Sequence, residues 1–328
     1  MKDEEIDALK GLLRNPLGDI QLEDLLRDAV GAATEGLNDD EFPTSASDLS
    51  LIGFAPVWLG QVQEYESTIG PLVEPARLIG SYGLGAHAQV WKRFVAPVAR
   101  WADTVQGVPA LVDLRGYPAL VLMYTVALAS VLRENYGPLH GSAVLPRVHG
   151  RSTLGASRTD PLVAAVDVRS VAFDGSGPIA TALAMSDSGT EVTDGLLEKL
   201  SRGNPRHTPM SDHLHSYLRP FFETELTRDQ EWDEAFERAE VLLDALATDV
   251  EAQSSTRSFR TPGGYGRYTW RFLHSDLPLE KQILSEVERD QEKWPPVAAG
   301  LFGGQAARAI AALSAISEIA EMVRRKQW

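Results

Sequence analysis

The sequence predicts a mainly α-helical protein, a multi-helix bundle with an irregular middle segment and a small β-hairpin near residues 258–273. Three observations support this fold class. Apolar residues recur at helical spacing in both the first and the last third of the chain. Gly, Ser, Pro and Thr become frequent between them, and one late stretch alternates polar and aromatic residues with the period of a strand. We therefore expect an N-terminal helical half (1–136), an irregular insert or linker (137–190) and a C-terminal helical half (191–328).

The N-terminal half begins with two amphipathic stretches, 3–14 and 20–37, separated by a helix breaker at Asn15–Gly18. The pattern from 51 to 80 is also helical, but three prolines predict that it forms short pieces, because proline lacks a backbone donor. These are Pro56, Pro71 and Pro75. A further amphipathic helix is predicted over 87–105.

The most hydrophobic run of the chain extends from Tyr117 to Leu132. A transmembrane helix needs roughly 18 or more apolar residues, and this run is shorter and contains Thr125 and Ser130. We therefore expect a central helix buried on all sides. Insertion into a membrane is the alternative.

The middle segment offers two weak motifs for chemistry. Gly175, Gly177 and Ala180 follow the G-x-G-x-x-A pattern of dinucleotide-binding loops, and the preceding Leu162–Phe173 could form a strand or a short helix. No alternating series of strands and helices surrounds the motif, which favours a plain loop. His140-Gly141-Ser142, His149 and Ser157 could supply a Ser–His pair, but sequence spacing cannot establish its geometry.

The C-terminal half contains the clearest helical pattern, at 228–251, followed by helices predicted at 279–293 and 305–326. Ser211 is expected to cap the N-terminus of an earlier helix. The many acids of the 228–251 helix lie off its apolar stripe, so we expect them to be solvated.

Composition excludes several classes of function. The chain has 46 acidic and 31 basic side chains, a net charge of −15 and no cysteine. The absence of cysteine excludes disulfide scaffolds, thiolate zinc sites and cysteine nucleophiles. The acidic balance makes nucleic acid an unfavourable partner and argues against adhesion to an anionic membrane. The acidic N-terminus does not resemble a secretory signal, so a cytoplasmic location is expected.

Three histidines, His207, His213 and His215, lie close together with Asp212. Residues two apart on a helix point to different faces, so the last two histidines are poorly placed to share a metal. We expect surface or capping histidines here, and neither a metal nor a cofactor.

Residues 252–275 contain four arginines, five aromatic residues and no acid. A strand would place Tyr268, Trp270 and Phe272 on one face and the arginines on the other. One interpretation is a docking patch for a partner that is acidic at its contact surface. The other is a hairpin that seals the core with its aromatics and pairs its arginines with the chain's own acidic helix. The residues assigned to the docking patch are Arg257, Arg260, Arg267, Arg271, Tyr265, Tyr268 and Trp270.

Four phrases together resemble the helical accessory regions of bacterial conflict proteins, which act in antiphage defence. They are DLRGYPALVLMY (113–124), YLRPFF (217–222), YGRYTW (265–270) and GLFGG (300–304). The resemblance implies a sensor, regulator or scaffold for an effector and brings no catalytic motif with it.

These observations predict a non-enzymatic interaction or regulatory subunit of a bacterial protein complex, with another protein as its partner. A homo-oligomer is compatible with the same sequence. Two alternatives remain: a hydrolase with its site in or beside 137–215, and a membrane-acting effector that uses 117–132.

Overall fold

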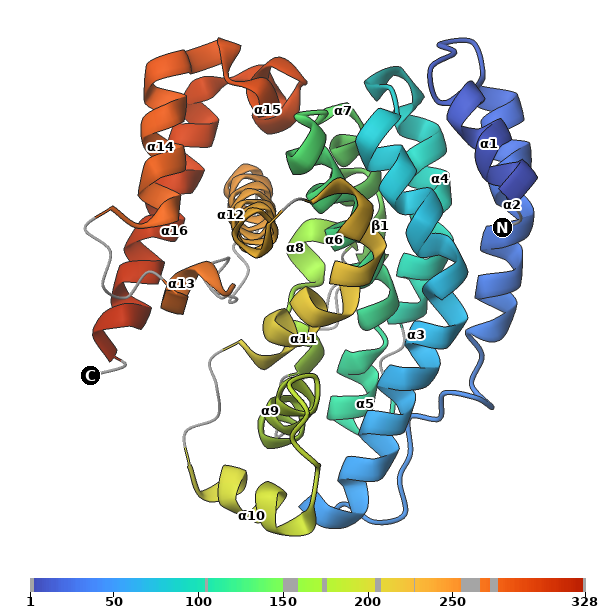
Figure 1. Ribbon diagram of the computed structural model, residues 1–328, viewed down its shortest axis with the longest axis vertical. Helices are drawn as coiled ribbons and strands as arrows, with labels where there is room; N and C mark the ends of the chain where they lie inside the picture. The colour runs from blue at the N-terminus through green and yellow to red at the C-terminus, as the bar shows by residue number, and fades with distance from the viewer. Residues whose placement is uncertain are drawn as a thin grey trace.

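The computed structural model is mainly helical, with 78% of its residues in helices, which confirms the predicted fold class (Figure 1). It describes residues 3–103, 106–149, 159–172, 176–203, 208–226, 228–254, 266–271 and 277–326. The main helices follow one another from one side of the molecule to the other (Figure 1). In this order they are α1 (Asp3–Leu12) and α2 (Asp19–Gly36), α3 (Leu51–Tyr82) and α4 (Ala88–Ala99), the central helix α6 (Tyr117–Arg133), α12 (Asp229–Gln253), and finally α14 (Leu279–Asp290) and α16 (Ala306–Lys326).

The two N-terminal amphipathic helices form as predicted, α1 from Asp3 to Leu12 and α2 from Asp19 to Gly36. Helix α2 buries one stripe, formed by Leu22, Leu26, Val30 and Ala33. The exposed side of this helix carries acids and small residues, among them Asp24, Asp28 and Ala32.

The expectation of short pieces between 51 and 80 is wrong, because a single helix, α3, runs from Leu51 to Tyr82 through all three prolines. Each proline removes one backbone hydrogen bond. The helix survives because side chains are buried along its whole length, from Phe54 to Ile79, and hold it against its neighbours. Near its end, a Cβ atom at Gly80 would lie 2.5 Å from the carbonyl oxygen of Val126, so glycine allows α3 to approach α6 closely.

The apolar run forms α6, from Tyr117 to Arg133, and every residue from Tyr117 to Ser130 is buried, as predicted. Among the described residues one stretch, Pro109–Arg133, is long and apolar enough to cross a membrane, and 94% of its most apolar window is buried inside the protein. The other elements of this region are α4 (Ala88–Ala99), a 3₁₀ turn (Arg100–Asp103) and α5 (Pro109–Leu114).

The middle segment consists of short elements, and it also contributes to the core. Leu139, Val148, Leu162 and Ile179 are all buried in the same hydrophobic cluster as residues of both halves. Two strands, Arg147–His149 and Thr159–Pro161, pair antiparallel. The helical pieces are α7 (Gly137–Leu139), a π-helical turn (His140–Val144), α8 (Leu162–Ala165), a 3₁₀ turn (Ser170–Ala172) and α9 (Gly177–Ser186).

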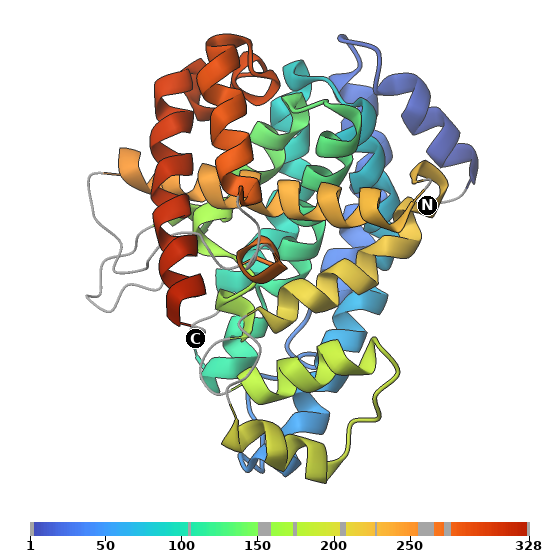
Figure 2. The same ribbon diagram turned by 60° about the vertical axis from the view of Figure 1, so that its left-hand side comes forward.

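The C-terminal half is built around α12, from Asp229 to Gln253. Helices α14 (Leu279–Asp290) and α16 (Ala306–Lys326) cover it on one side, and α6 and α8 pack on the other (Figure 2). The smaller elements are α10 (Asp194–Arg202), α11 (Pro209–Leu218), α13 (Tyr268–Arg271), α15 (Pro295–Ala298) and 3₁₀ turns at Arg219–Glu225, Gln291–Lys293 and Leu301–Gly304.

Two local predictions in this half are wrong. Among the described residues 266–271 no strand forms, because Tyr268–Arg271 is the helical turn α13, and the two strands that the structure describes pair at 147–149 and 159–161. Thr208, and not Ser211, precedes α11, since Ser211 lies inside the helix with its hydroxyl donated to Glu240. In both places, side-chain contacts to α12 determine the backbone more strongly than the local pattern does.

Candidate functional site

Arg271 on α13 and Arg267 just before this helix are bound by acids of their own chain. One nitrogen of Arg267 lies 2.6 Å from Asp212 on α11, and Arg271 lies 2.5 Å from Asp233 and 3.0 Å from Glu237 on α12. The Arg267 side chain is only 11% exposed. These contacts are the ones expected if the segment pairs with the chain's own acidic helix.

The aromatic residues of the same segment are divided between the core and its edge. Tyr268 is completely buried and donates its hydroxyl to Asp244 at 2.7 Å, so it offers no surface to a partner. Trp270 is half-buried, donates to Thr208 at 3.2 Å and lies beneath the guanidinium of Arg267. Arg257, Arg260 and Tyr265 lie outside the described residues, so their part of the docking patch remains a prediction, and Phe272 lies outside them as well.

Several acids of α12 are not solvated, contrary to expectation, whereas Glu234 is exposed as expected. Glu237 and Glu240 are each 1% exposed. Burial raises the pKa of Glu240 to about 8 despite its hydrogen bond from Ser211, so this carboxyl is protonated at neutral pH. Burial likewise raises the pKa of Glu237 to about 7, against the opposing charges of Arg271 and Arg267. A periodic pattern cannot reveal such burial, because the covering residues come from distant parts of the chain.

The two histidines of α11 point to opposite sides, as their spacing predicts, but neither is a surface residue. His213 lies between Asp187 at 2.8 Å and Glu66 at 2.7 Å. Burial alone would lower its pKa, but these two carboxylates outweigh burial and raise the pKa to about 9. His213 is therefore an imidazolium that joins α3, α9 and α11.

His215 faces α12 and lies 2.7 Å from Asp233. Burial and the nearby charge of Arg267 lower its pKa to about 4, so this imidazole is neutral at pH 7. No group of three or more His, Asp or Glu side chains within the described part of the chain is arranged to hold a metal ion. His207 lies outside the described residues.

The motifs of the middle segment do not assemble a site among the residues that the structure describes. Ser142 is fully buried and donates to the carbonyl of Pro138, while His149 pairs with Asp103 at 3.0 Å. Gly177 begins α9, and the described part of the stretch before it, 162–172, contains no strand, only the short helical pieces Leu162–Ala165 and Ser170–Ala172. Gly175 and Ser157 lie outside the described residues.

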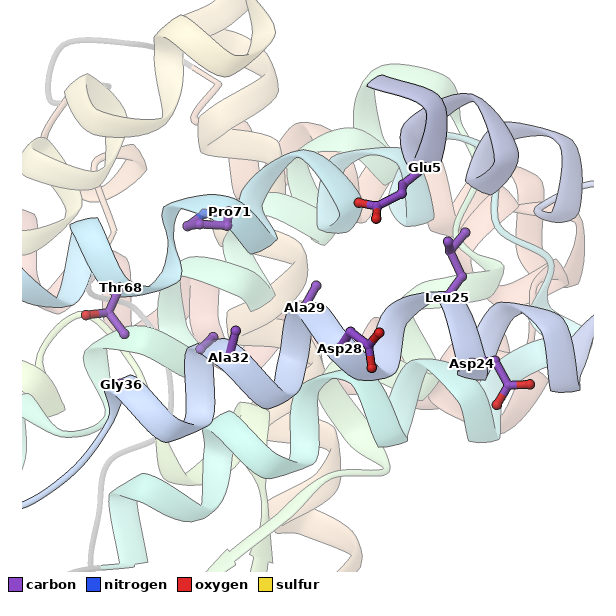
Figure 3. Close-up of a pocket in the computed structure, with 10 residues that line it drawn as sticks. Glu5, Asp24, Leu25, Asp28, Ala29, Ala32, Gly36, Thr68 and Pro71 are labelled. Atoms are coloured by element: carbon purple, nitrogen blue, oxygen red, sulfur yellow. The ribbon is translucent and has the colours of Figure 1, made fainter. Parts of the chain in front are cut away.

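The candidate site is a groove between α1, α2 and α3, with a volume of about 540 Å³. We call it the acidic groove. Its lining residues are Glu5, Asp24, Leu25, Asp28, Ala29, Ala32, Ala33, Gly36, Thr68 and Pro71. Figure 3 shows Glu5, Leu25 and Asp24 toward one end, Thr68 and Gly36 at the other, and the side chains of Ala29 and Ala32 between them.

The acidic groove follows from local sequence features. Leu25, Ala29, Ala32 and Gly36 recur every three or four residues and so lie along one face of α2. At the Gly36 end, a Cβ atom on Gly36 would approach the Thr68 methyl to 2.8 Å, so α2 and α3 touch there. This stripe of small residues is present in the sequence at 25–36 but carries no catalytic or ligand-binding signature.

No family model, no curated protein and no solved structure matches this chain.

Proposed function

We propose that the protein is a non-enzymatic interaction subunit that binds a helix of a partner protein in the acidic groove. Amphipathic helices commonly bind in grooves of this kind, with anchor side chains three or four residues apart. The lining of α2 extends over residues 24–36, and at 1.5 Å per residue this is roughly 18 Å, or about three helical turns.

The observation that carries this proposal is the floor of small residues in an open groove. Ala29 and Ala32 project little side-chain bulk, so beyond the point where α3 touches Gly36 a second helix could approach α2 at the short end of the usual 8–10 Å interaxial range. Ala32 is exposed and Ala29 is half-buried, beside the stripe that α2 buries in the core. A partner helix would cover the part of this face that remains exposed.

The segment 252–275, which we call the arginine–aromatic segment, is a weaker docking candidate than the acidic groove. Arg267 and Arg271 already contact Asp212, Asp233 and Glu237, so an acidic partner would have to displace these internal acids. The phrases that resemble bacterial conflict proteins imply that the resulting complex would act in antiphage defence.

A matched pair of variants tests the proposal. Ala32→Trp fills the acidic groove, and Ala311→Trp adds the same side chain at an exposed alanine on the distant helix α16. Tagged wild-type protein and both variants would be isolated from the native host, and the bound proteins would be quantified by mass spectrometry. We expect a partner that wild type and Ala311→Trp retain in equal amount and Ala32→Trp loses. Equal retention by all three proteins would contradict the proposal.

A further inference from the structure

The charges of the acidic groove are distributed unevenly. Glu5, Asp24 and Asp28 lie toward one end, whereas Gly36, Thr68 and Pro71 form an uncharged opposite end (Figure 3). None of the lining residues is Lys, Arg or His. The polar end therefore offers carboxylate acceptors to a ligand that carries hydrogen-bond donors.

Two of these carboxylates, those of Asp24 and Asp28, are available at modest cost. Asp24 pairs with Arg27 at 2.6 Å, but both side chains are more than half exposed, and such pairs contribute only about 0–1 kcal/mol. Asp28 is exposed, and within the described residues no ion pair holds it. Both acids lie on α2 four residues apart, so one turn of a bound helix could reach them together.

We infer that the occupant of the acidic groove is an amphipathic helix with Lys or Arg clustered in its last turn and apolar residues before it. This inference rests on the proposed function and adds the chemistry and direction of the partner. Basic residues in a last turn complement the negative end of their own helix dipole as well as Asp24 and Asp28. The bound helix therefore runs antiparallel to α2, with its apolar residues over Ala29 and Ala32.

The net charge of −15 supports the same choice of partner. A field of one sign attracts an oppositely charged ligand and raises its association rate, and salt screens this attraction. Binding should consequently weaken as ionic strength increases, while the apolar contacts over the alanine floor should be much less sensitive to salt.

Three labelled helical peptides of about four turns test the inference, each with the same apolar stripe. One carries two lysines in its last turn, one carries them in its first turn, and one carries glutamines instead. Fluorescence anisotropy would be measured at two salt concentrations. We expect the peptide with last-turn lysines to bind tightest, with an affinity about tenfold higher than that of the glutamine peptide at low salt, as two exposed ion pairs allow.

Two double variants identify the charges responsible. Asp24→Lys with Asp28→Lys should remove the tighter binding of the last-turn lysine peptide relative to the glutamine peptide. Glu288→Lys with Glu318→Lys makes the same change in net charge at exposed positions on α14 and α16 and should leave most of this difference in affinity. Circular dichroism melting would confirm that all variants fold. An equal loss in both double variants would show nonspecific attraction and overturn the inference.

The remaining outcomes separate the two proposals. If the glutamine peptide binds as tightly as the lysine peptides and Ala32→Trp abolishes its binding, the acidic groove is a docking site but its charge preference is refuted. If first-turn lysines bind as well as last-turn lysines, the antiparallel direction is wrong. If none of the peptides responds to Ala32→Trp, the proposed function itself fails.

Discussion

Helices α6 and α12 lie side by side at the centre of the molecule, yet they are buried by different means (Figure 1). Helix α6 is apolar around its whole circumference and contains no acid or base before Arg133. Helix α12 buries Glu237, Glu240 and Asp249, each at most 4% exposed. The hydrophobic effect alone accounts for burying α6, whereas α12 requires partners for each of its acids.

Those partners come from distant parts of the chain. Arg308 on α16 donates two hydrogen bonds, of 2.8 and 2.7 Å, to the two oxygens of Asp249, and Arg271 reaches Glu237. Glu240 is instead neutral. Its two carboxyl oxygens accept hydrogen bonds from the Ser211 hydroxyl, the Tyr124 hydroxyl and the backbone N–H of Arg267. Burial of a charged helix is therefore a property of the assembled fold, and its sensitivity to substitution should differ from that of α6.

The largest expected effect is on α6. Leu122→Asp would place a carboxylate among apolar side chains at a position that is 0% exposed. An unpaired buried charge costs several kcal/mol, a large part of a typical stability of about 5–15 kcal/mol. We expect an insoluble or unfolded chain, with Leu122→Met as a control that costs less than about 1.5 kcal/mol. Soluble yield and urea denaturation measure both, and a folded Leu122→Asp protein of parental stability would refute the burial of α6.

The next effect is on α12. Arg308→Ala strands Asp249, which is 5% exposed on its side chain, and breaking a buried pair from one side costs about 3 kcal/mol. Arg27→Ala is the matched control, since its pair with Asp24 is exposed, and it should cost less than about 1 kcal/mol. Urea denaturation gives both values. Equal costs for the two arginines would show that the pairing of α12 contributes nothing special.

The smallest effect concerns Glu240 at low pH, and it grows as pH rises. Because its folded pKa is raised from 4.5 to about 8, the folded state keeps a proton that the unfolded state loses above pH 4.5. Stability from this group therefore falls as pH rises from about 4.5 to 8, by up to about 1.4 kcal/mol per pH unit. Glu240→Gln removes this ionisation and should cost less than about 1 kcal/mol below about pH 4.5, where the unfolded wild-type carboxyl is still largely protonated.

The pH dependence distinguishes this explanation from a simple loss of packing. Denaturation of wild type and Glu240→Gln would be compared at pH 5, 6, 7 and 8. We expect the difference to shift in favour of the glutamine variant as pH rises, because only the wild-type group ionises. Parallel curves at all four values would mean that Glu240 is already ionised in the folded state.

The same contrast explains what the sequence could predict. The existence of α1, α2, α12 and α16 follows from apolar periodicity and that of α6 from its continuous apolar run, signals that each helix carries within its own residues. The continuity of α3 through Pro56, Pro71 and Pro75 depends on packing against other helices, so local rules predicted breaks. The strand pattern at 267–272 failed for the same reason, since Arg267 and Tyr268 are positioned by acids on α11 and α12.

The candidate site was less accessible to prediction. In the sequence, the small and acidic residues on α2 are those of an ordinary solvated helix face. The groove exists only because α1 and α3 pack beside this face in the fold. The arginine–aromatic segment, by contrast, has a distinctive composition, and composition cannot distinguish acids of a partner from acids of the same chain. Only the contacts of Arg267 and Arg271 separate the two interpretations.

The most direct test of this account is the free energy of unfolding of Arg267→Ala, measured by urea denaturation at pH 7. Arg267 is bound inside the protein by Asp212, whose side chain is 6% exposed, and we propose that a partner binds in the acidic groove instead. The expected loss is about 3 kcal/mol, as for a buried ion pair broken from one side. A change within about 0.5 kcal/mol, as for an ordinary surface substitution, would contradict the internal pairing of Arg267 and would again favour the arginine–aromatic segment as a docking surface.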